Sequence, residues 1–192
     1  FRETYGGLHQ KYGVAPDLAV FGKALGNGYA ITAVVGRRAV MEAAQSSFIS
    51  STFWTERIGP SAGLKTLEVM DNLKSWDVIT NIGHTIRNGW QVLAEKYSLD
   101  LRVSGIPALS SFTIHSDKAL EYKTLITQEL LKRNFLAATS VYASIAHTPE
   151  ILNAYFEALE HAFSLIATCE DGYDVTKLLA TPVCHQGFKR LN

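Results

Sequence analysis

The chain has little of several features that mark specialised classes of protein. Its 192 residues include two cysteines, Cys169 and Cys184, which are too few for a disulfide framework. No apolar run approaches the roughly 18 residues that a membrane-spanning helix needs, and no signal-peptide pattern opens the chain. We therefore expect a cytoplasmic protein from a reducing compartment, without a membrane partner.

An excess of charge of either sign is also missing. Lys and Arg together number 18, as do Asp and Glu, so the formal net charge is zero. Without clustered basic residues, the chain has no electrostatic attraction for nucleic acid or anionic membranes. We therefore expect no nucleic-acid partner. The hydrophobic share of 47% is that of an ordinary globular protein with one or two domains.

Sequence motifs for metal binding and for hydrolysis are absent as well. The histidines show no paired spacing on one expected face, and the adjacent pair Cys184-His185 is far from further ligands in the sequence. No Ser-His-Asp arrangement and no phosphate-binding P-loop can be assembled from motifs. We expect no metal site.

What the chain does contain is two regions of different pattern, which divide near residue 98. In residues 1–98, the runs at residues 18–21 and 31–35 are apolar throughout. This pattern is typical of strands that are covered on both faces in a parallel or mixed α/β sheet. Helices are expected at residues 37–45, 56–70 and 76–97.

Residues 99–192 have the pattern of an α+β region, with short strands between amphipathic helices. Thr148 and Pro149 predict the start of a long helix, because they supply a capping hydroxyl and a proline at the first helical position. The residues expected on its buried face are Leu152, Tyr155, Phe156, Leu159, Phe163 and Ile166. The other expected elements are strands at residues 101–103, 108–115 and 141–144, a turn at 104–107 and a helix at 118–133.

Lys23 stands at an unusual place in the first region. It follows the apolar run at residues 18–21 and precedes the turn-forming cluster Gly26-Asn27-Gly28. Its stem could cover apolar surface while its amine reaches water. It could instead be a Schiff-base nucleophile held against a carbonyl cofactor, since strand ends that open into loops are where α/β proteins bind ligands. Position alone leaves both interpretations open.

A wider pattern decides between them. The segment "PDLAVFGKALGNGYAITAVVG" (residues 16–36) resembles the cofactor-lysine segment of the class III aminotransferases, most of all the glutamate-1-semialdehyde aminomutase branch. The resemblance continues, in the same order, at "STFWTERIGPSAGLKTLEVM" (residues 51–70) and "FLAATSVYASIAHTPEIL" (residues 135–152).

The resemblance implies the α/β aspartate-aminotransferase-like fold, which is fold type I of the pyridoxal 5'-phosphate enzymes. Residues 1–98 would be the last part of the cofactor-binding large domain with its connecting helices. Residues 99–192 would be the α+β C-terminal small domain.

The resemblance also implies roles for four residues. Lys23 matches the lysine that holds pyridoxal 5'-phosphate as a Schiff base and then moves the proton. Thr52 matches the threonine that bonds the cofactor phosphate across the interface of a homodimer, although on its own it could be a helix cap. Gly26 and Gly28 match the turn that lets the backbone pass close to the cofactor.

Four neighbours of Thr52 each leave two interpretations open. Phe53 and Trp54 could shape the substrate entrance or simply pack together. Glu56 and Arg57 could face the substrate or form the charged first turn of a helix.

The implied activity is amino-group transfer on a small amino/keto or amino-aldehyde substrate, and aminotransferase, aminomutase and racemase chemistry all remain open. The family's other cofactor groups lie upstream of the lysine, and Phe1-Arg2 resembles the end of the segment that carries its aspartate. We therefore expect the chain to be the C-terminal portion of a longer enzyme. The alternative is an inactive truncated relic, or a subunit-interaction domain without catalysis.

Overall fold

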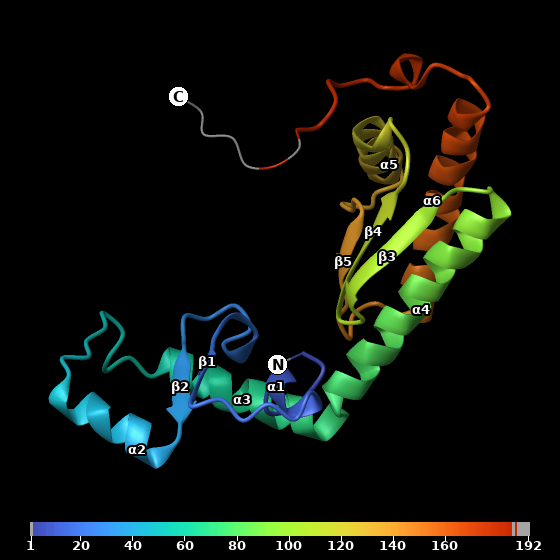
Figure 1. Ribbon diagram of the computed structural model, residues 1–192. Coiled ribbons are helices and arrows are strands. Elements are labelled where there is room, and N and C mark those ends of the chain that lie inside the picture. The colour runs from blue at the N-terminus through green and yellow to red at the C-terminus, as the bar shows by residue number, and fades with distance from the viewer. Residues whose placement is uncertain (1, 186, 188–192) are drawn as a thin grey trace, which may run out of the picture. The chain divides into compact units, whose positions relative to one another are not determined.

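A computed structural model of the chain describes residues 2–185 and 187, so Phe1 lies outside the described residues. Two compact units are present, Phe1–Ile79 and Thr80–Asn192 (Figure 1). The division falls inside a helix, earlier than the boundary expected near residue 98, because most of that helix packs into the core of the second unit. The assignment of residues 1–98 and 99–192 to two enzyme domains stays a prediction.

The first unit contains one pair of strands and several helices. Strand β1 (Leu18–Phe21) pairs antiparallel with β2 (Ala33–Gly36), with Leu18 opposite Gly36. The 3-10 helix η1 (Lys23–Leu25) lies between them in the sequence. The other elements are α1 (Leu8–Lys11), α2 (Arg38–Met41), η2 (Glu42–Ser46) and α3 (Ile58–Leu73).

The apolar strands of this unit are not covered on both faces by the described residues. Val20 is 71% exposed, and Val34 and Val35 are about half exposed. The two strands also pair antiparallel with each other. The apolar runs therefore predicted the two strands correctly. The prediction that both faces of these strands are buried is wrong for the described part of the chain.

The second unit is a three-stranded antiparallel sheet with helices. Its strands are β3 (Leu101–Ile106), β4 (Leu109–Ile114) and β5 (Ser140–Tyr142), in the order β3-β4-β5. Helix α4 (Ser75–Lys96) begins in the first unit and continues into the second. The unit also holds α5 (Ala119–Lys132), α6 (Pro149–Glu170) and η3 (Val175–Lys177). No helix among the described residues is both long and apolar enough to cross a bilayer.

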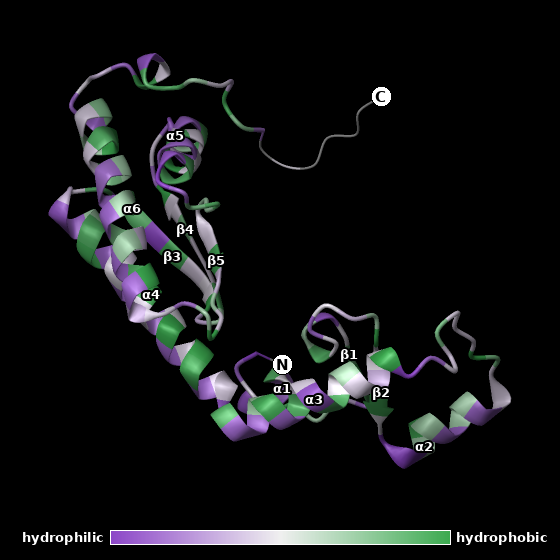
Figure 2. Cartoon of the chain, turned by 180° about the vertical axis from the view of Figure 1, so that it is seen from behind, coloured by the Kyte–Doolittle hydropathy of each residue, from purple (hydrophilic) through white to green (hydrophobic). Residues whose placement is uncertain are grey.

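The core of the second unit is built from aromatic rings on three elements. Trp90 of α4 packs edge-on against Phe112 of β4, with ring centroids 4.8 Å apart, and Phe112 packs against Phe163 of α6 at 5.8 Å. Hydrophobic and hydrophilic residues alternate along α4, α5 and α6 (Figure 2), as expected for helices with one buried face. The predicted face of α6 is confirmed except at Phe156, which is only partly buried.

Local signals place the ends of two elements in this unit. The Thr148 side chain accepts a hydrogen bond from the Ile151 N–H at 3.4 Å, which confirms the predicted cap of α6. The predicted turn at residues 104–107 was too early, because β3 continues to Ile106 and only Pro107 and Ala108 separate it from β4. Gly105 has a φ of 82° within the strand. Glycine tolerates this backbone without a steric cost, and Gly105 still pairs with Ser110 of β4.

Cys169 and Cys184 are both free thiols. Cys169 is fully buried in the core, and burial raises the pKa of its thiol. It therefore stays protonated and packs as a small apolar side chain.

The Tyr155 hydroxyl satisfies a buried donor at the centre of this core. The Trp90 Nε1–H donates to it at 2.8 Å, and Trp90 is fully buried. Replacing Tyr155 by Phe leaves the indole N–H without an acceptor, at a cost of about 1–3 kcal/mol. We expect Tyr155→Phe to lower the free energy of unfolding in urea by that amount.

The matched control is Tyr97→Phe, which removes a partly buried hydroxyl that donates to Glu160 at 3.1 Å near the surface. Removing this hydroxyl leaves no buried donor without an acceptor, so the expected cost is smaller than that of Tyr155→Phe. Equal losses for the two variants would contradict a special role for the Trp90–Tyr155 bond.

Candidate functional site

Lys23 begins η1, one residue after the end of β1, and has a left-handed backbone with a φ of 49°. For a residue other than glycine, this conformation costs about 1–2 kcal/mol. The residue is exposed, while Leu25, two positions later, is buried. The surrounding loop therefore holds Lys23 in a strained backbone with its side chain at the surface, and such strain is typical of functional positions.

The turn after Lys23 is closed by its own backbone. The Asn27 N–H donates to the Lys23 carbonyl at 3.2 Å, and the Tyr29 N–H donates to the Gly26 carbonyl at 3.1 Å. A Cβ on Gly26 would overlap the Tyr29 carbonyl oxygen, so the turn itself requires this glycine. Gly28 has a φ of 110°, and a Cβ there would meet nothing within 4 Å. The side of Gly28 on which a Cβ would lie is therefore open space.

Helix α3 supports this turn through two glycines that the sequence analysis did not single out. A Cβ on Gly59 would lie 2.6 Å from the Ala30 carbonyl oxygen. A Cβ on Gly63, one turn later, would lie 3.5 Å from Ile31 Cδ1. The available signal was the spacing of two glycines four positions apart at the start of a predicted helix, because that spacing puts both on one face.

Thr52 is exposed in the turn that precedes α3. In this turn, the Phe53 N–H donates to the Ser51 hydroxyl at 3.2 Å and the Glu56 N–H donates to the Phe53 carbonyl at 3.1 Å. Glu56, and not Thr52, caps α3: its carboxylate accepts from the Ile58 N–H at 2.5 Å and from the Gly59 N–H at 3.2 Å. Glu56 and Arg57 do not form the first turn of a helix, because α3 begins at Ile58; Glu56 precedes that turn and supports it as a side-chain acceptor.

Large apolar side chains close to Thr52 in the sequence are exposed at the surface of the first unit. Phe53 is 56% exposed, Trp54 is 67% exposed and Phe48 is 96% exposed. Phe53 and Trp54 are thus not packing residues within the described part of the chain. An exposed apolar cluster of this kind is typical of a surface that meets another molecule.

The structure thus brings Lys23, Gly26 and Gly28 into one loop, and it places Thr52 in a separate turn. Helix α3 is the element that both segments share, because its first turn contacts Ala30 and is capped by Glu56. The roles of the four residues toward a cofactor stay predictions.

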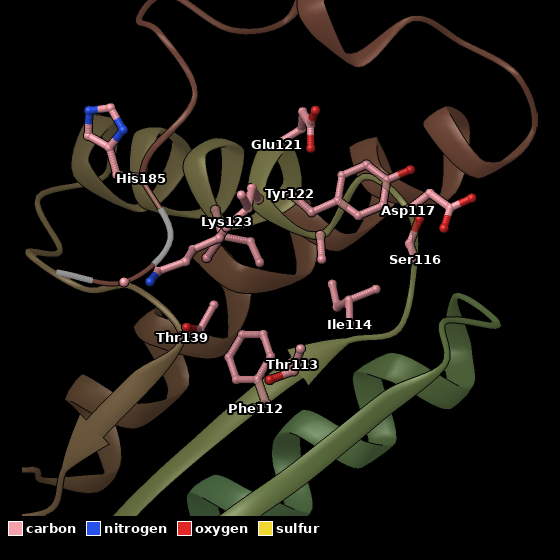
Figure 3. A pocket seen from close by; sticks show the side chains of 14 residues that line it. Phe112, Thr113, Ile114, Ser116, Asp117, Glu121, Tyr122, Lys123, Thr139 and His185 are labelled. Carbon is pink, nitrogen blue, oxygen red and sulfur yellow. The ribbon is translucent and has the colours of Figure 1, made fainter. Parts of the chain in front are cut away.

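Two cavities are lined by other residues, although the first includes Leu25, which lies two positions after Lys23. One, of about 610 Å³, is on the first unit and is lined mainly by apolar side chains such as Phe21 and Val35. The other, of about 540 Å³, lies between β4 and α5 of the second unit. Figure 3 shows Lys123 and His185 on one side of it and Asp117 on the other. Neither cavity is lined by Lys23 or Thr52.

The charges of the described residues do not gather into a metal centre. Within residues 2–185 and 187, no group of three or more His, Cys, Asp and Glu residues is arranged to hold a metal ion.

Comparisons with known proteins align most of the chain. Residues 4–149 match the family described as aminotransferase class-III. A 3-aminobutyryl-CoA aminotransferase from Cloacimonas acidaminovorans is 32% identical over 170 residues, which are 85% of this chain and 41% of the relative. A glutamate-1-semialdehyde 2,1-aminomutase from Methanosphaera stadtmanae is 28% identical over 181 residues, which are 85% of this chain and 43% of the relative.

A solved structure aligns over a similar length. The FumI protein of a Sphingopyxis species, in its PLP internal aldimine form, has a TM-score of 0.76 at 22% identity and covers 89% of this chain and 42% of that one. This likeness confirms the predicted aspartate-aminotransferase-like fold, fold type I, with a partial large domain. The chain spans about two fifths of the length of these relatives.

A substitution at Glu56 tests whether its carboxylate stabilises the start of α3. Replacing Glu56 by Ala leaves the Ile58 and Gly59 N–H groups without their acceptor. We expect Glu56→Ala to lower the free energy of unfolding by about 1 kcal/mol and to speed amide exchange at these two residues. In the control, Glu56→Gln, the side chain keeps an acceptor oxygen, so most of the effect should vanish. Unchanged exchange in Glu56→Ala would contradict the cap.

Proposed function

The chain belongs to the class III aminotransferases, and on this premise we propose that it supplies Lys23 and Thr52 to the catalytic site of an aminotransferase or aminomutase. The cofactor of this family is pyridoxal 5'-phosphate. The observation that carries the proposal is the strained, exposed Lys23 at the end of β1. Because the chain spans about two fifths of its relatives, the proposal assigns it a share of the site.

The residues present fit this cofactor in three respects. Lys23 offers an exposed primary amine, and the open space beside Gly28 leaves room for a flat ring close to the backbone. Thr52 offers an exposed hydroxyl, which can donate to a phosphate oxygen. These groups are the amine and the phosphate donor that the cofactor requires from this part of the chain.

When bound, pyridoxal 5'-phosphate supplies an aldehyde that reacts with primary amines and a ring that accepts the electron pair left when a substrate carbon loses a proton. Lys23 would hold that aldehyde through its amine. With substrate bound, the Lys23 Nζ would take the proton from the substrate carbon that bears the amino group and would later return it, acting first as a base and then as an acid.

The substrate class follows from this chemistry and from the relatives. The proposed role of Lys23 requires a small molecule with a primary amine on a carbon that can lose a proton. The relatives named above include an aminotransferase and an aminomutase. The proposal therefore covers small amino/keto and amino-aldehyde substrates. It includes a cytoplasmic location, which agrees with two free cysteines.

A homodimer is part of the proposal. Thr52 is close in sequence to the exposed side chains Phe48, Phe53 and Trp54, which would lose water contact against a second subunit. In this arrangement, Thr52 holds the cofactor phosphate of the neighbouring subunit while Lys23 holds the cofactor of its own.

Covalent trapping tests the role of Lys23. The protein that carries this chain is incubated with pyridoxal 5'-phosphate, reduced with borohydride and digested, and the modified lysine is identified by mass. We expect the label on Lys23 and a visible absorbance band that Lys23→Ala abolishes, because only this amine is held at the site.

The control is Lys65→Ala, which removes an exposed lysine of the same unit, paired with Glu68, and should keep both signals. A label spread equally over Lys65 and Lys23 would sink the proposal. It would favour the interpretation as a subunit-interaction domain without catalysis.

Subunit complementation tests the shared site. Lys23→Ala and Thr52→Val homodimers each contain two defective sites, and we expect about tenfold weaker cofactor binding in the second because a bond to a charged group is lost. Mixed dimers regain one intact site only if lysine and threonine come from different subunits.

We expect mixing to restore activity to about half of the wild-type value per mixed dimer, since one of its two sites is whole. If mixing restores nothing although mixed dimers form, the two residues serve the site of one subunit.

A further inference from the structure

We propose that Gly59 is a positioning residue for Lys23, and that the first turn of α3 couples the Lys23 loop to the turn that carries Thr52. This inference rests on the proposed function, since it assigns these segments a shared geometric requirement. The residues that a Cβ on Gly59 would meet are Ala30 and Ile31, and neither Lys23 nor Thr52 is among them. It acts through the backbone that lies between them.

The contact that carries the inference is between Gly59 and Ala30. A Cβ on Gly59 would lie 2.6 Å from the Ala30 carbonyl oxygen and 3.3 Å from Ile31 Cβ. Real Cβ atoms do not approach a backbone oxygen this closely, so any larger residue would push the loop and α3 apart. The absence of a side chain at Gly59 thus sets how near the end of the loop lies to the helix.

A displacement at Ala30 would be passed back to Lys23, because the turn between them is short and bonded. The Tyr29 N–H donates to the Gly26 carbonyl, and the Asn27 N–H donates to the Lys23 carbonyl. The Tyr29 carbonyl lies so close to Gly26 that no Cβ fits between them. The turn therefore has little freedom to change its conformation, so a displacement of Ala30 would also move Lys23.

The same glycine also joins the helix to the Thr52 turn. Its N–H donates to the Glu56 carboxylate at 3.2 Å, while its Cα faces Ala30. The Glu56 N–H in turn donates to the Phe53 carbonyl at 3.1 Å, next to Thr52. Gly59 thus contacts the Lys23 loop at Ala30 and the Thr52 turn through the Glu56 carboxylate.

Gly63 supplies a matched control on the same helix face. A Cβ on Gly63 would lie 3.5 Å from Ile31 Cδ1 and 3.8 Å from Leu25 Cδ1, which is ordinary contact between side chains. Gly59→Ala and Gly63→Ala both add one methyl group to α3 and both favour the helix over the unfolded chain. They differ in whether that methyl meets a backbone oxygen.

The experiment measures covalent trapping of pyridoxal 5'-phosphate at Lys23 in the full protein for the wild type and both variants. We expect Gly59→Ala to be trapped on the order of a hundredfold more slowly, since a shift of about 1 Å misaligns the reacting amine. Gly63→Ala should be trapped at the wild-type rate. Circular dichroism of the cofactor-free forms checks that both variants are folded.

A second measurement on the wild type keeps the test decisive if Gly59→Ala fails to fold. Amide exchange is followed with and without pyridoxal 5'-phosphate. We expect the cofactor to slow exchange at Asn27 and Tyr29 and, through the shared contact, at Ile58 and Gly59.

Slowing at Asn27 and Tyr29 alone, or equal trapping rates in the two glycine variants, would overturn the coupling and leave Lys23 as the cofactor lysine. No trapping at Lys23 in the wild type would instead overturn the proposed function, so the two failures can be told apart.

Discussion

The close approach of α3 to the loop after Lys23 is the constraint on which the candidate site depends. Gly59 lets the Ala30 carbonyl lie against the first turn of the helix, and Gly63 leaves room for Ile31. The loop is then held in a form that includes a left-handed Lys23, which an isolated peptide would avoid. The strain at the lysine is therefore stabilised by packing at a distance from it.

The two units differ in how far their apolar residues are buried. In the second unit, the Trp90, Phe112 and Phe163 rings form a closed core in which the indole N–H has its acceptor. In the first unit, Val20 and Trp54 are mostly exposed. The second unit thus has a core of its own, whereas Lys23 and Thr52 lie on the unit that exposes more of its apolar side chains.

Family membership narrows the chemistry of the site without selecting one reaction. Relatives with comparable identity are named as an aminotransferase and as an aminomutase. A fold shared by several reactions cannot choose among them, because the choice is made by the groups around the substrate. The role proposed for Lys23 covers what these reactions have in common, namely a proton that one amine takes from the substrate and returns.

The sequence by itself determined the family, the fold type, the extent of most helices and the cap of α6 at Thr148. These depend on local patterns: helical spacing of apolar residues, a hydroxyl before a proline, and a lysine between an apolar run and glycines. Only the tertiary structure decided that Glu56 caps α3, that Gly59 admits the Ala30 carbonyl, and that β1 and β2 are exposed within the described residues. The physical reason is that each of these features depends on contacts between atoms that only the folded backbone brings together. Local sequence patterns do not specify such contacts.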